Sequence, residues 1–304
     1  MRAPAWRFSR FPSGHHILKK LADQMVYSLL SELPIALGLP TMYKSYCRVC
    51  GGRSRRGRPW KLADGLVESW QIDSRWRRMI ERREGLGCGR CGSVSRFRYL
   101  ARVIMEELGA PELGYESFAD YAGSVDFRQL RVAEVNGCGP LHGYLALNPE
   151  LAYSEYGSED PAIPSEDLAR LSYRDREFDL VVTSDTLEHL PDLSRSLAEI
   201  ERILKPGGRH IFTVPVIWDG RKTRRRAVLD GERIVHLCPP SYHGVWSAQS
   251  PDRLVFHEFG EDVLDYLQRP GTEIKVRHHP GNSSIAVFVA ARAADEGHAD
   301  PADT

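Results

Sequence analysis

The most informative stretch of the chain begins with the strand-like run Phe178-Asp-Leu-Val-Val-Thr183 and continues through Asp185 into a helical segment. A short, mostly apolar run rich in β-branched residues predicts a strand buried on both faces of a sheet. From Asp192 to Leu204 apolar side chains recur at helical spacing, and Lys205-Pro-Gly-Gly208 ends that helix before a second strand-like run, Arg209–Val214. Strand, helix and strand in this order predict a parallel α/β sheet.

The same alternation extends the predicted sheet in both directions. Further strands are expected at Leu130–Val135, Leu151–Tyr156, Glu273–His279 and Ser284–Ala291. Amphipathic helices are expected ahead of the sheet at His16–Glu32 and Ser93–Leu108, and residues 215–257 form a long insertion. No apolar run approaches the roughly 20 residues that cross a bilayer.

A glycine-containing turn, Asn136-Gly-Cys-Gly139-Pro140, follows the first strand of the predicted sheet. Glycines at a strand-to-helix turn let the backbone approach a ligand closely. Glu155 stands at the end of the next strand, where a carboxylate can accept hydrogen bonds from both hydroxyls of a ribose. The pair predicts an adenosine-type cofactor site, and the alternative is that Glu155 is a solvated strand end. The turn lacks the features of a phosphate-binding loop and the full dinucleotide fingerprint, which disfavours a nucleotidase and an NAD dehydrogenase.

Four of the six cysteines form two short-spaced pairs, Cys47-Arg-Val-Cys50 and Cys88-Gly-Arg-Cys91. Four thiolates on two tight turns predict a closed, tetrahedral structural zinc site. Two unrelated pairs of free thiols are the alternative, because the pairs are further apart than in compact zinc ribbons. Cys138 and Cys238 are expected to be small buried residues.

Charge is distributed unevenly along the chain although the formal net charge is zero. Residues 1–100 hold 20 Lys and Arg against 7 Asp and Glu, and the remainder is correspondingly acidic. Either two complementary regions dock, or the basic region meets an anionic partner such as nucleic acid, a nucleotide-linked substrate or an acidic membrane surface. The start of the chain lacks the apolar core of a secretory signal, so the cytoplasm is the expected location.

The segments from Phe178 to Asp192 and from Leu197 to Pro215 closely resemble class I S-adenosylmethionine-dependent methyltransferases, specifically the type 11 group. The segment from Cys88 to Leu100 resembles the cysteine-bearing module that precedes the methyltransferase domain in some bacterial members. The resemblance implies a Rossmann-like α/β fold with a seven-stranded sheet in the order 3-2-1-4-5-7-6 and an antiparallel last strand. The expected regions are a helical and zinc-binding module over 1–110, a methyltransferase domain over 111–292 with 215–257 as a lid, and a disordered tail over 293–304.

The resemblance also implies which residues hold S-adenosylmethionine. Its amino-acid end would be bound by Glu134, Gly137 and Gly139, its ribose by Glu155, and the edge of its adenine by Asp167 and Leu168, with Asp185 near the methyl group or the amino-acid moiety. The turn departs from the family pattern acid-x-Gly-x-Gly-x-Gly, since Asn136, Cys138 and Pro140 stand at the glycine positions.

Histidines in the insertion are the candidate catalytic residues, because removal of a proton from a hydroxyl acceptor is helped by a base with a pKa near neutrality. His243 and His257 are the two candidates, and a packing or surface role is the alternative for each. Glu188-His189 either binds a divalent ion or starts a helix. The run Arg221–Arg226 either binds an anionic substrate or keeps a loop solvated.

The sequence therefore predicts an S-adenosylmethionine-dependent methyltransferase that acts on an O or N atom of a small-molecule or glycan-type acceptor. Methylation of RNA or protein, with the basic zinc module holding the macromolecule, is a second hypothesis. A degenerate methyltransferase fold that only binds is a third, because the first motif is altered.

Overall fold

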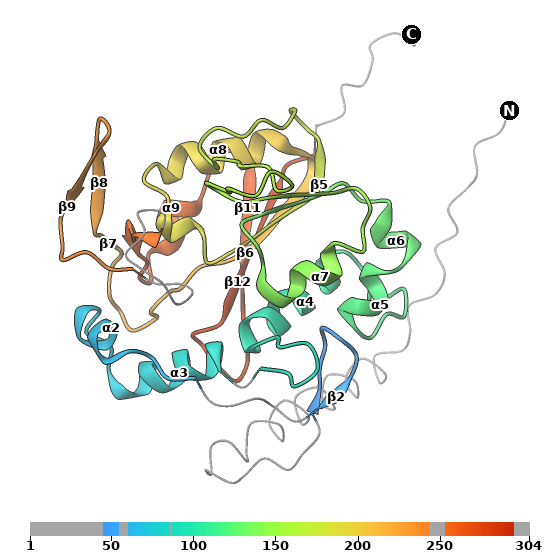
Figure 1. The fold of residues 1–304 in the computed structure, drawn as a ribbon, viewed down its shortest axis with the longest axis horizontal. Helices are drawn as coiled ribbons and strands as arrows, with labels where there is room; N and C mark the ends of the chain where they lie inside the picture. Colours follow the sequence, from blue (N-terminus) through green and yellow to red (C-terminus); the bar gives the residue numbers. More distant parts are fainter. Residues whose placement is uncertain (1–44, 55–59, 86, 243–252, 295–304) are drawn as a thin grey trace, which may run out of the picture. The chain divides into compact units, whose positions relative to one another are not determined.

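The computed structural model describes residues 45–54, 60–85, 87–242 and 253–294 (Figure 1). The chain divides into two compact units, Met1–Tyr43 and Lys44–Thr304, and all of the described residues belong to the second. The predicted helix His16–Glu32 and the candidate base His243 lie outside the described residues.

A mixed sheet of six strands forms the centre of the described structure. In spatial order the strands are β11 (Thr272–His278), β12 (Ala286–Arg292), β6 (Leu204–Thr213), β5 (Phe178–Ser184), β3 (Val132–Val135) and β4 (Leu151–Ser154). The strands β4, β3, β5 and β6 run parallel, whereas β12 is antiparallel to both β6 and β11. The carboxyl ends of the parallel strands therefore meet at one edge, which we call the carboxyl edge.

The strand that the expected order places outermost, next to β4, is missing from the described residues. The six strands otherwise follow the expected order, with the last strand in sequence antiparallel. At the missing position Ser165 forms only an isolated parallel bridge to Glu155. Pro161 and Pro164 precede this bridge. Since proline has no N–H to donate, this segment cannot extend a ladder beside β4.

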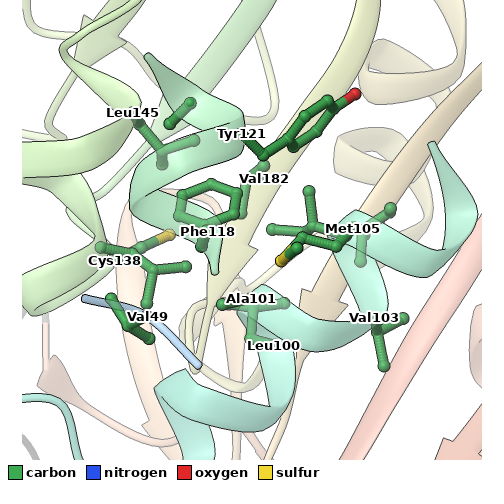
Figure 2. Close-up of a cluster of buried hydrophobic side chains, with 14 of the residues drawn as sticks. Val49, Leu100, Ala101, Val103, Met105, Phe118, Tyr121, Cys138, Leu145 and Val182 are labelled. Atoms are coloured by element: carbon green, nitrogen blue, oxygen red, sulfur yellow. The ribbon is translucent and has the colours of Figure 1, made fainter. Parts of the chain in front are cut away.

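Helices cover both faces of the sheet, as the strand pattern predicts. One face is covered by α4 (Ser95–Glu107), α5 (Phe118–Ala122), α6 (Val125–Arg128) and α7 (His142–Leu145), and the other by α8 (Leu193–Ile203) and α9 (Val263–Leu267). Leu180 and Val182 of β5 point to the first face and Val181 to the second, because successive side chains of a strand alternate. Figure 2 shows the first face, with Phe118 and Cys138 in one buried cluster.

The helix predicted after β5 is confirmed as α8. It begins after Asp192, whose side chain accepts a hydrogen bond from the Arg195 backbone N–H at 3.0 Å. This contact satisfies one of the donors that a helix start leaves without an intrahelical partner. The chain then passes directly from Ile203 into β6, where Gly207 has a left-handed φ of +76°.

The segment before the sheet and the insertion pack against each other. The segment before the sheet holds β1 (Ser45–Tyr46), β2 (Arg53–Ser54), α2 (Asp64–Ser69) and α3 (Ser74–Glu84). The insertion and its end hold β7 (Arg224–Arg225), β8 (Ala227–Asp230), β9 (Arg233–His236) and β10 (His257–Glu258). Trp70 and Trp76 share a small core with Ile217 and Val255 of the insertion.

Two arginines of the run Arg221–Arg226 join the insertion to the end of α2. Arg226 is 2% exposed, forms an ion pair of 2.5 Å with Glu258 and donates a hydrogen bond to the Ser69 hydroxyl. Arg221 donates to the Trp70 carbonyl at 2.7 Å. These two side chains therefore hold the fold together, although the sequence suggested a solvated loop or an anion site. No helix in the described ranges has the length and apolarity that a membrane span requires.

Candidate functional site

The turn after β3 is closed by Glu134, which is fully buried. One carboxylate oxygen of Glu134 accepts a hydrogen bond from the Cys138 backbone N–H at 2.6 Å, and the other lies 2.7 Å from His142 Nδ1. Asn136 and Gly139 adopt left-handed conformations, with φ of +59° and +55°. In this structure Glu134 supports the turn from inside, and contact with a ligand's amino-acid end stays a prediction.

Gly137 and Glu155 face each other, as the cofactor hypothesis requires. A Cβ atom added at Gly137 would lie 3.5 Å from Glu155 Oε1 and 3.1 Å from the Tyr153 hydroxyl. Glycine at this position therefore lets the turn backbone lie close to the Tyr153 hydroxyl and the Glu155 carboxylate. A ribose brought close to the turn backbone would meet Glu155 there, so the residues present fit an adenosine group.

Tyr153 was not anticipated from the sequence, and it donates its hydroxyl to Glu155. Burial and the neighbouring carboxylate raise the pKa of Tyr153, so the hydroxyl keeps the proton that it donates. The Tyr153 ring packs against the His142 ring with centroids 4.1 Å apart. A tyrosine two residues before Glu155 on the same face of a strand was the only local signal for this contact.

Asp167 and Leu168 follow shortly after Ser165, which is bridged to Glu155. The Asp167 side chain is exposed at the surface and accepts a hydrogen bond from the Ala169 N–H at 2.8 Å. Leu168 is buried in the core. The chain thus brings both residues to the end of β4, and their role at an adenine edge stays a prediction.

Asp185 directly follows β5 in a left-handed conformation, with φ of +51°, and forms ion pairs with two arginines from preceding helices. Arg83 of α3 lies 2.6 Å from Oδ1, and Arg96 of α4 lies 3.4 Å from Oδ2. The Thr213 hydroxyl donates to Oδ1 at 2.8 Å. Burial acts to raise the pKa of Asp185, but the two guanidinium groups outweigh it and hold the pKa well below its usual range. Asp185 is therefore a fixed, ionised carboxylate at the carboxyl edge.

Glu84 completes this charged network. Its carboxylate lies 2.6 Å from Arg83 and 2.9 Å from Arg96, so two cations alternate with two anions. The nearby Glu188 is fully buried, and burial together with Asp185 raises its pKa well above the usual value. No local pattern indicates a role for Arg83 and Arg96, because their partner Asp185 lies far along the chain.

The start of α4 lies directly on the glycine turn. A Cβ atom at Gly139 would lie 2.6 Å from the Phe97 ring, and the Arg96 guanidinium lies 4.2 Å from the centroid of the same ring. A Cβ atom at Gly92, just after the second cysteine pair, would lie 3.8 Å from Pro140. The cysteine-bearing segment therefore contacts the turn predicted to hold the cofactor.

His257 lies in β10 and is 4% exposed. Its Nε2 lies 3.1 Å from the Leu190 carbonyl oxygen, and its ring stacks near Phe259 with centroids 5.7 Å apart. Burial lowers the pKa of His257 to about 4. These contacts describe a packed, neutral imidazole, and a catalytic role for it stays a prediction.

The four paired cysteines converge as the spacing predicts. Their Sγ atoms all lie within 4.8 Å of one another, with Cys47 to Cys91 and Cys50 to Cys88 at 3.8 Å each. A tetrahedron of sulfurs around zinc, with Zn–S near 2.3 Å, has S···S separations of about 3.8 Å. Burial raises the pKa of the Cys47 and Cys50 thiols, and a bound dication is what would favour their thiolates. The donor set therefore fits zinc.

Backbone hydrogen bonds close both cysteine turns and connect the first of them to α5. Gly51 and Gly92, with φ of +67° and +75°, close the turns by donating to the carbonyls of Cys47 and Cys88. The carbonyls of Arg48 and Val49 accept hydrogen bonds at 2.8 Å from the first two N–H groups of α5. Among the described residues, these four cysteines form the one cluster with at least three potential metal ligands. Glu188 and His189 belong to no such cluster.

The carboxyl edge thus combines a glycine turn, the Glu155 carboxylate beside it and a buried ionic network; the first two are the features expected of an adenosine-cofactor site in an α/β protein. Residues 146–212 match the family described as "Methyltransferase domain". This match runs from just before β4 through β6, the part of the fold that holds Glu155 and Asp185.

Individual relatives are methyltransferases as well. The chain is 31% identical over 114 residues, which is 37% of this chain and 41% of the relative, to a dimethylglycine N-methyltransferase of Parasynechococcus marenigrum. It is 35% identical over 74 residues, 24% of this chain and 13% of the relative, to a glycine/sarcosine/dimethylglycine N-methyltransferase of Actinopolyspora halophila. The chain thus spans less than half the length of these curated relatives.

Among solved structures, one similar chain is the 1,6-didemethyltoxoflavin-N1-methyltransferase of Burkholderia thailandensis with bound 1,6-didemethyltoxoflavin and S-adenosylhomocysteine. The similarity has a TM-score of 0.36 and 15% identity, and it covers 67% of this chain and 92% of the other. The matched domain and the named relatives support an S-adenosylmethionine-dependent methyltransferase.

Proposed function

We propose that this protein is an S-adenosylmethionine-dependent methyltransferase that transfers a methyl group to an N or O atom of a small molecule. The observation that carries the proposal is that Gly137 and Glu155 face each other at the carboxyl edge, inside or directly beside the segment that matches the methyltransferase domain. The names of the relatives favour a nitrogen acceptor over an oxygen acceptor. Nothing in the structure favours a glycan.

The residues of the carboxyl edge suit such a donor. S-adenosylmethionine supplies a methyl group already activated on a sulfonium, so the protein must chiefly align the groups and exclude water. Glu155 would accept hydrogen bonds from the ribose hydroxyls, while Gly137 lets the turn backbone approach. The amino-acid end is a zwitterion, and Arg96 and Asp185 offer one cation and one anion next to the turn. The fixed geometry of that ion pair would orient the ligand without further rearrangement.

Binding and transfer can be tested separately. Calorimetry with S-adenosylhomocysteine on the full chain tests the cofactor site, and incubation with methyl-labelled S-adenosylmethionine and fractionated cell extract tests transfer. We expect saturable binding and label in the small-metabolite fraction. Binding without label in any fraction would favour a degenerate fold that only binds, and no binding at all would refute the proposal.

A macromolecular acceptor is the second candidate, because the first hundred residues carry a strong excess of Lys and Arg. The two hypotheses differ in their response to salt. Binding of RNA releases counterions, so methylation of RNA should fall steeply with ionic strength, whereas methylation of a neutral small molecule should not. Label entering RNA with a steep salt dependence would replace the small-molecule proposal.

We further propose that Cys47, Cys50, Cys88 and Cys91 hold one structural zinc ion. The proposal is supported by the four converging sulfurs and by the contacts that both cysteine turns make with α5 and Pro140. A closed site of four thiolates leaves no position for substrate, so the ion would stabilise the fold and take no part in the chemistry.

A further inference from the structure

A cavity of about 420 Å³, wide open to solvent, lies between α3 and the turn that joins β11 to β12, and Arg75 and Arg78 on its wall are exposed. Its walls are Arg75, Arg78 and Arg82, together with Met79 and residues 279–283. The three arginines are spaced so that they lie along one face of α3. The walls contain no Asp or Glu, so the cavity is lined by three positive charges and no negative one.

These arginines differ from the other charged residues of α3. Arg77 pairs with Asp64 and Glu81, and Arg83 pairs with Glu84 and Asp185. In contrast, Arg75, Arg78 and Arg82 form no ion pair or side-chain hydrogen bond with any residue in the described ranges. Like charges at this helical spacing destabilise a helix, and an anion bound between them would relieve the repulsion.

The cavity is fixed to the carboxyl edge of the sheet. Asn282, which is buried, donates its side-chain amide to the Met79 carbonyl at 2.9 Å and so joins the turn to α3. β12 pairs antiparallel with β6, so the turn before β12 projects from the edge at which β6 ends. On the same helix Arg83 reaches Asp185. The cavity and the candidate cofactor site therefore share α3 as a common wall.

We propose that this cavity binds the phosphate group of a small phosphorylated molecule. Guanidinium groups bind phosphate through paired, charge-assisted hydrogen bonds, and three of them around one cavity match a dianion. A volume of about 420 Å³ is that of a small-molecule site. Nucleic acid would instead require a basic track that follows many phosphates. The phosphorylated molecule would also be the methyl acceptor, and this part of the proposal rests on the proposed function. Phosphate binding itself does not depend on it.

The test uses the full chain, without S-adenosylmethionine, and three probes at constant ionic strength: inorganic pyrophosphate, glycerol 3-phosphate and a single-stranded RNA oligonucleotide. The variant Arg78→Gln/Arg82→Gln removes two charges from the wall. The matched control is Arg195→Gln, an exposed arginine of α8 that does not line the cavity. Calorimetry measures the affinity for each probe, and S-adenosylhomocysteine serves as a separate ligand.

We expect both small phosphates to bind the wild type and the control saturably, and the double variant to bind them at least about tenfold more weakly. S-adenosylhomocysteine should bind all three proteins equally. Absence of saturable phosphate binding, or equal binding by the double variant, would overturn the proposal. Tight RNA binding that is lost in the double variant would also overturn it, in favour of a nucleic-acid surface. If phosphate binds and S-adenosylhomocysteine does not, the anion site stands and the proposed methyl transfer fails.

Discussion

Single residues at the carboxyl edge explain why this turn and this carboxylate can serve one ligand. Gly137 has no side chain, so the turn backbone can lie close to Glu155 and Tyr153. Tyr153 donates to Glu155 and holds the carboxylate in one orientation. The restraint lowers the entropy that the carboxylate loses when a ligand binds.

Replacing Glu155 with alanine should weaken the binding of S-adenosylhomocysteine by about 1–3 kcal/mol, because the ribose loses its hydrogen-bond acceptor. Calorimetry on the purified chain measures the effect. Glu159→Ala, which changes an exposed glutamate further along the same loop, is the matched control and should bind like the wild type. Equal affinity in the Glu155 variant would show that the carboxylate does not face the ligand.

His257 should make stability depend on pH. Burial lowers its pKa from 6.5 to about 4, so between these values the unfolded chain binds a proton that the folded chain does not. The free energy of unfolding should therefore fall as the pH is lowered from about 6.5 towards 4, by up to about 1.4 kcal/mol per pH unit from this group.

The variant His257→Gln keeps a donor for the Leu190 carbonyl but does not titrate. Urea unfolding at several pH values should show a shallower pH dependence for this variant than for the wild type. His210, whose pKa burial lowers to about 3, contributes equally to both proteins. Exposed His236→Gln is the control and should leave the slope unchanged. A slope unaffected by His257→Gln would mean that the imidazole is not buried as the structure shows.

At the scale of elements, α4 connects the cysteine-bearing segment to the cofactor turn. Its residues Leu100, Ala101 and Ile104 are buried in the same cluster as Leu180 and Val182 of β5. Its first turn places Phe97 on Gly139 and Arg96 on Asp185. The helix therefore fixes one wall of the candidate site through its packing on the sheet.

Replacing Gly139 with alanine should destabilise the protein by about 1–2 kcal/mol through the left-handed backbone alone, and further through contact with the Phe97 ring. The same substitution should cost less in a Phe97→Ala background, because only the backbone term remains. Denaturant unfolding of the four proteins gives the coupling. Gly143→Ala in α7, where a Cβ meets open space, is the control and should be neutral or slightly stabilising. Equal costs in both backgrounds would show that Phe97 does not cover the turn.

At the level of the whole molecule, the described residues from 45 onward belong to one compact unit, and the cysteine-bearing segment shares a buried core with the sheet. Val49 and Cys88 belong to the same buried cluster as β5 and β12. Arg83 and Arg96, from the basic first hundred residues, form ion pairs with Asp185 in the acidic remainder of the chain. Loss of the metal should therefore affect the sheet as well as the cysteine turns.

We expect about one zinc ion per chain in protein purified without chelator, and loss of that ion together with stability on Cys88→Ser. Elemental analysis and thermal unfolding measure the two effects. Cys238→Ser, at a half-buried cysteine outside the cluster, should change neither. Native protein without zinc, or a Cys88 variant as stable as the wild type, would contradict the metal site.

Elements with a local signal could be predicted from the amino-acid sequence. Patterns a few residues long predict β5, α8 and β6 from the spacing of their apolar residues. Equally short patterns identify the two cysteine pairs and place Gly137 and Glu155 just after two successive strands. The fold confirms these strands and brings the four sulfurs and the glycine–carboxylate pair together. The missing outer strand is explained by Pro161 and Pro164, whose effect depends on which strand they would have to pair with.

Contacts between side chains that are distant in the sequence emerge only from the folded chain. The pairing of Asp185 with Arg83 and the three arginines around the cavity depend on how α3 packs on the carboxyl edge. The contact of Asp185 with Arg96 depends on the placement of α4, and the buried pair Arg226–Glu258 depends on how the insertion folds, where β7 pairs with β10. The sequence contains many arginines, and only their burial and the charges around them in the folded chain distinguish those that form buried ion pairs. A sequence pattern predicts a helix or a strand from the spacing of its apolar residues. The partner of a buried charge depends instead on how the elements pack, because a buried charge without a partner is energetically costly.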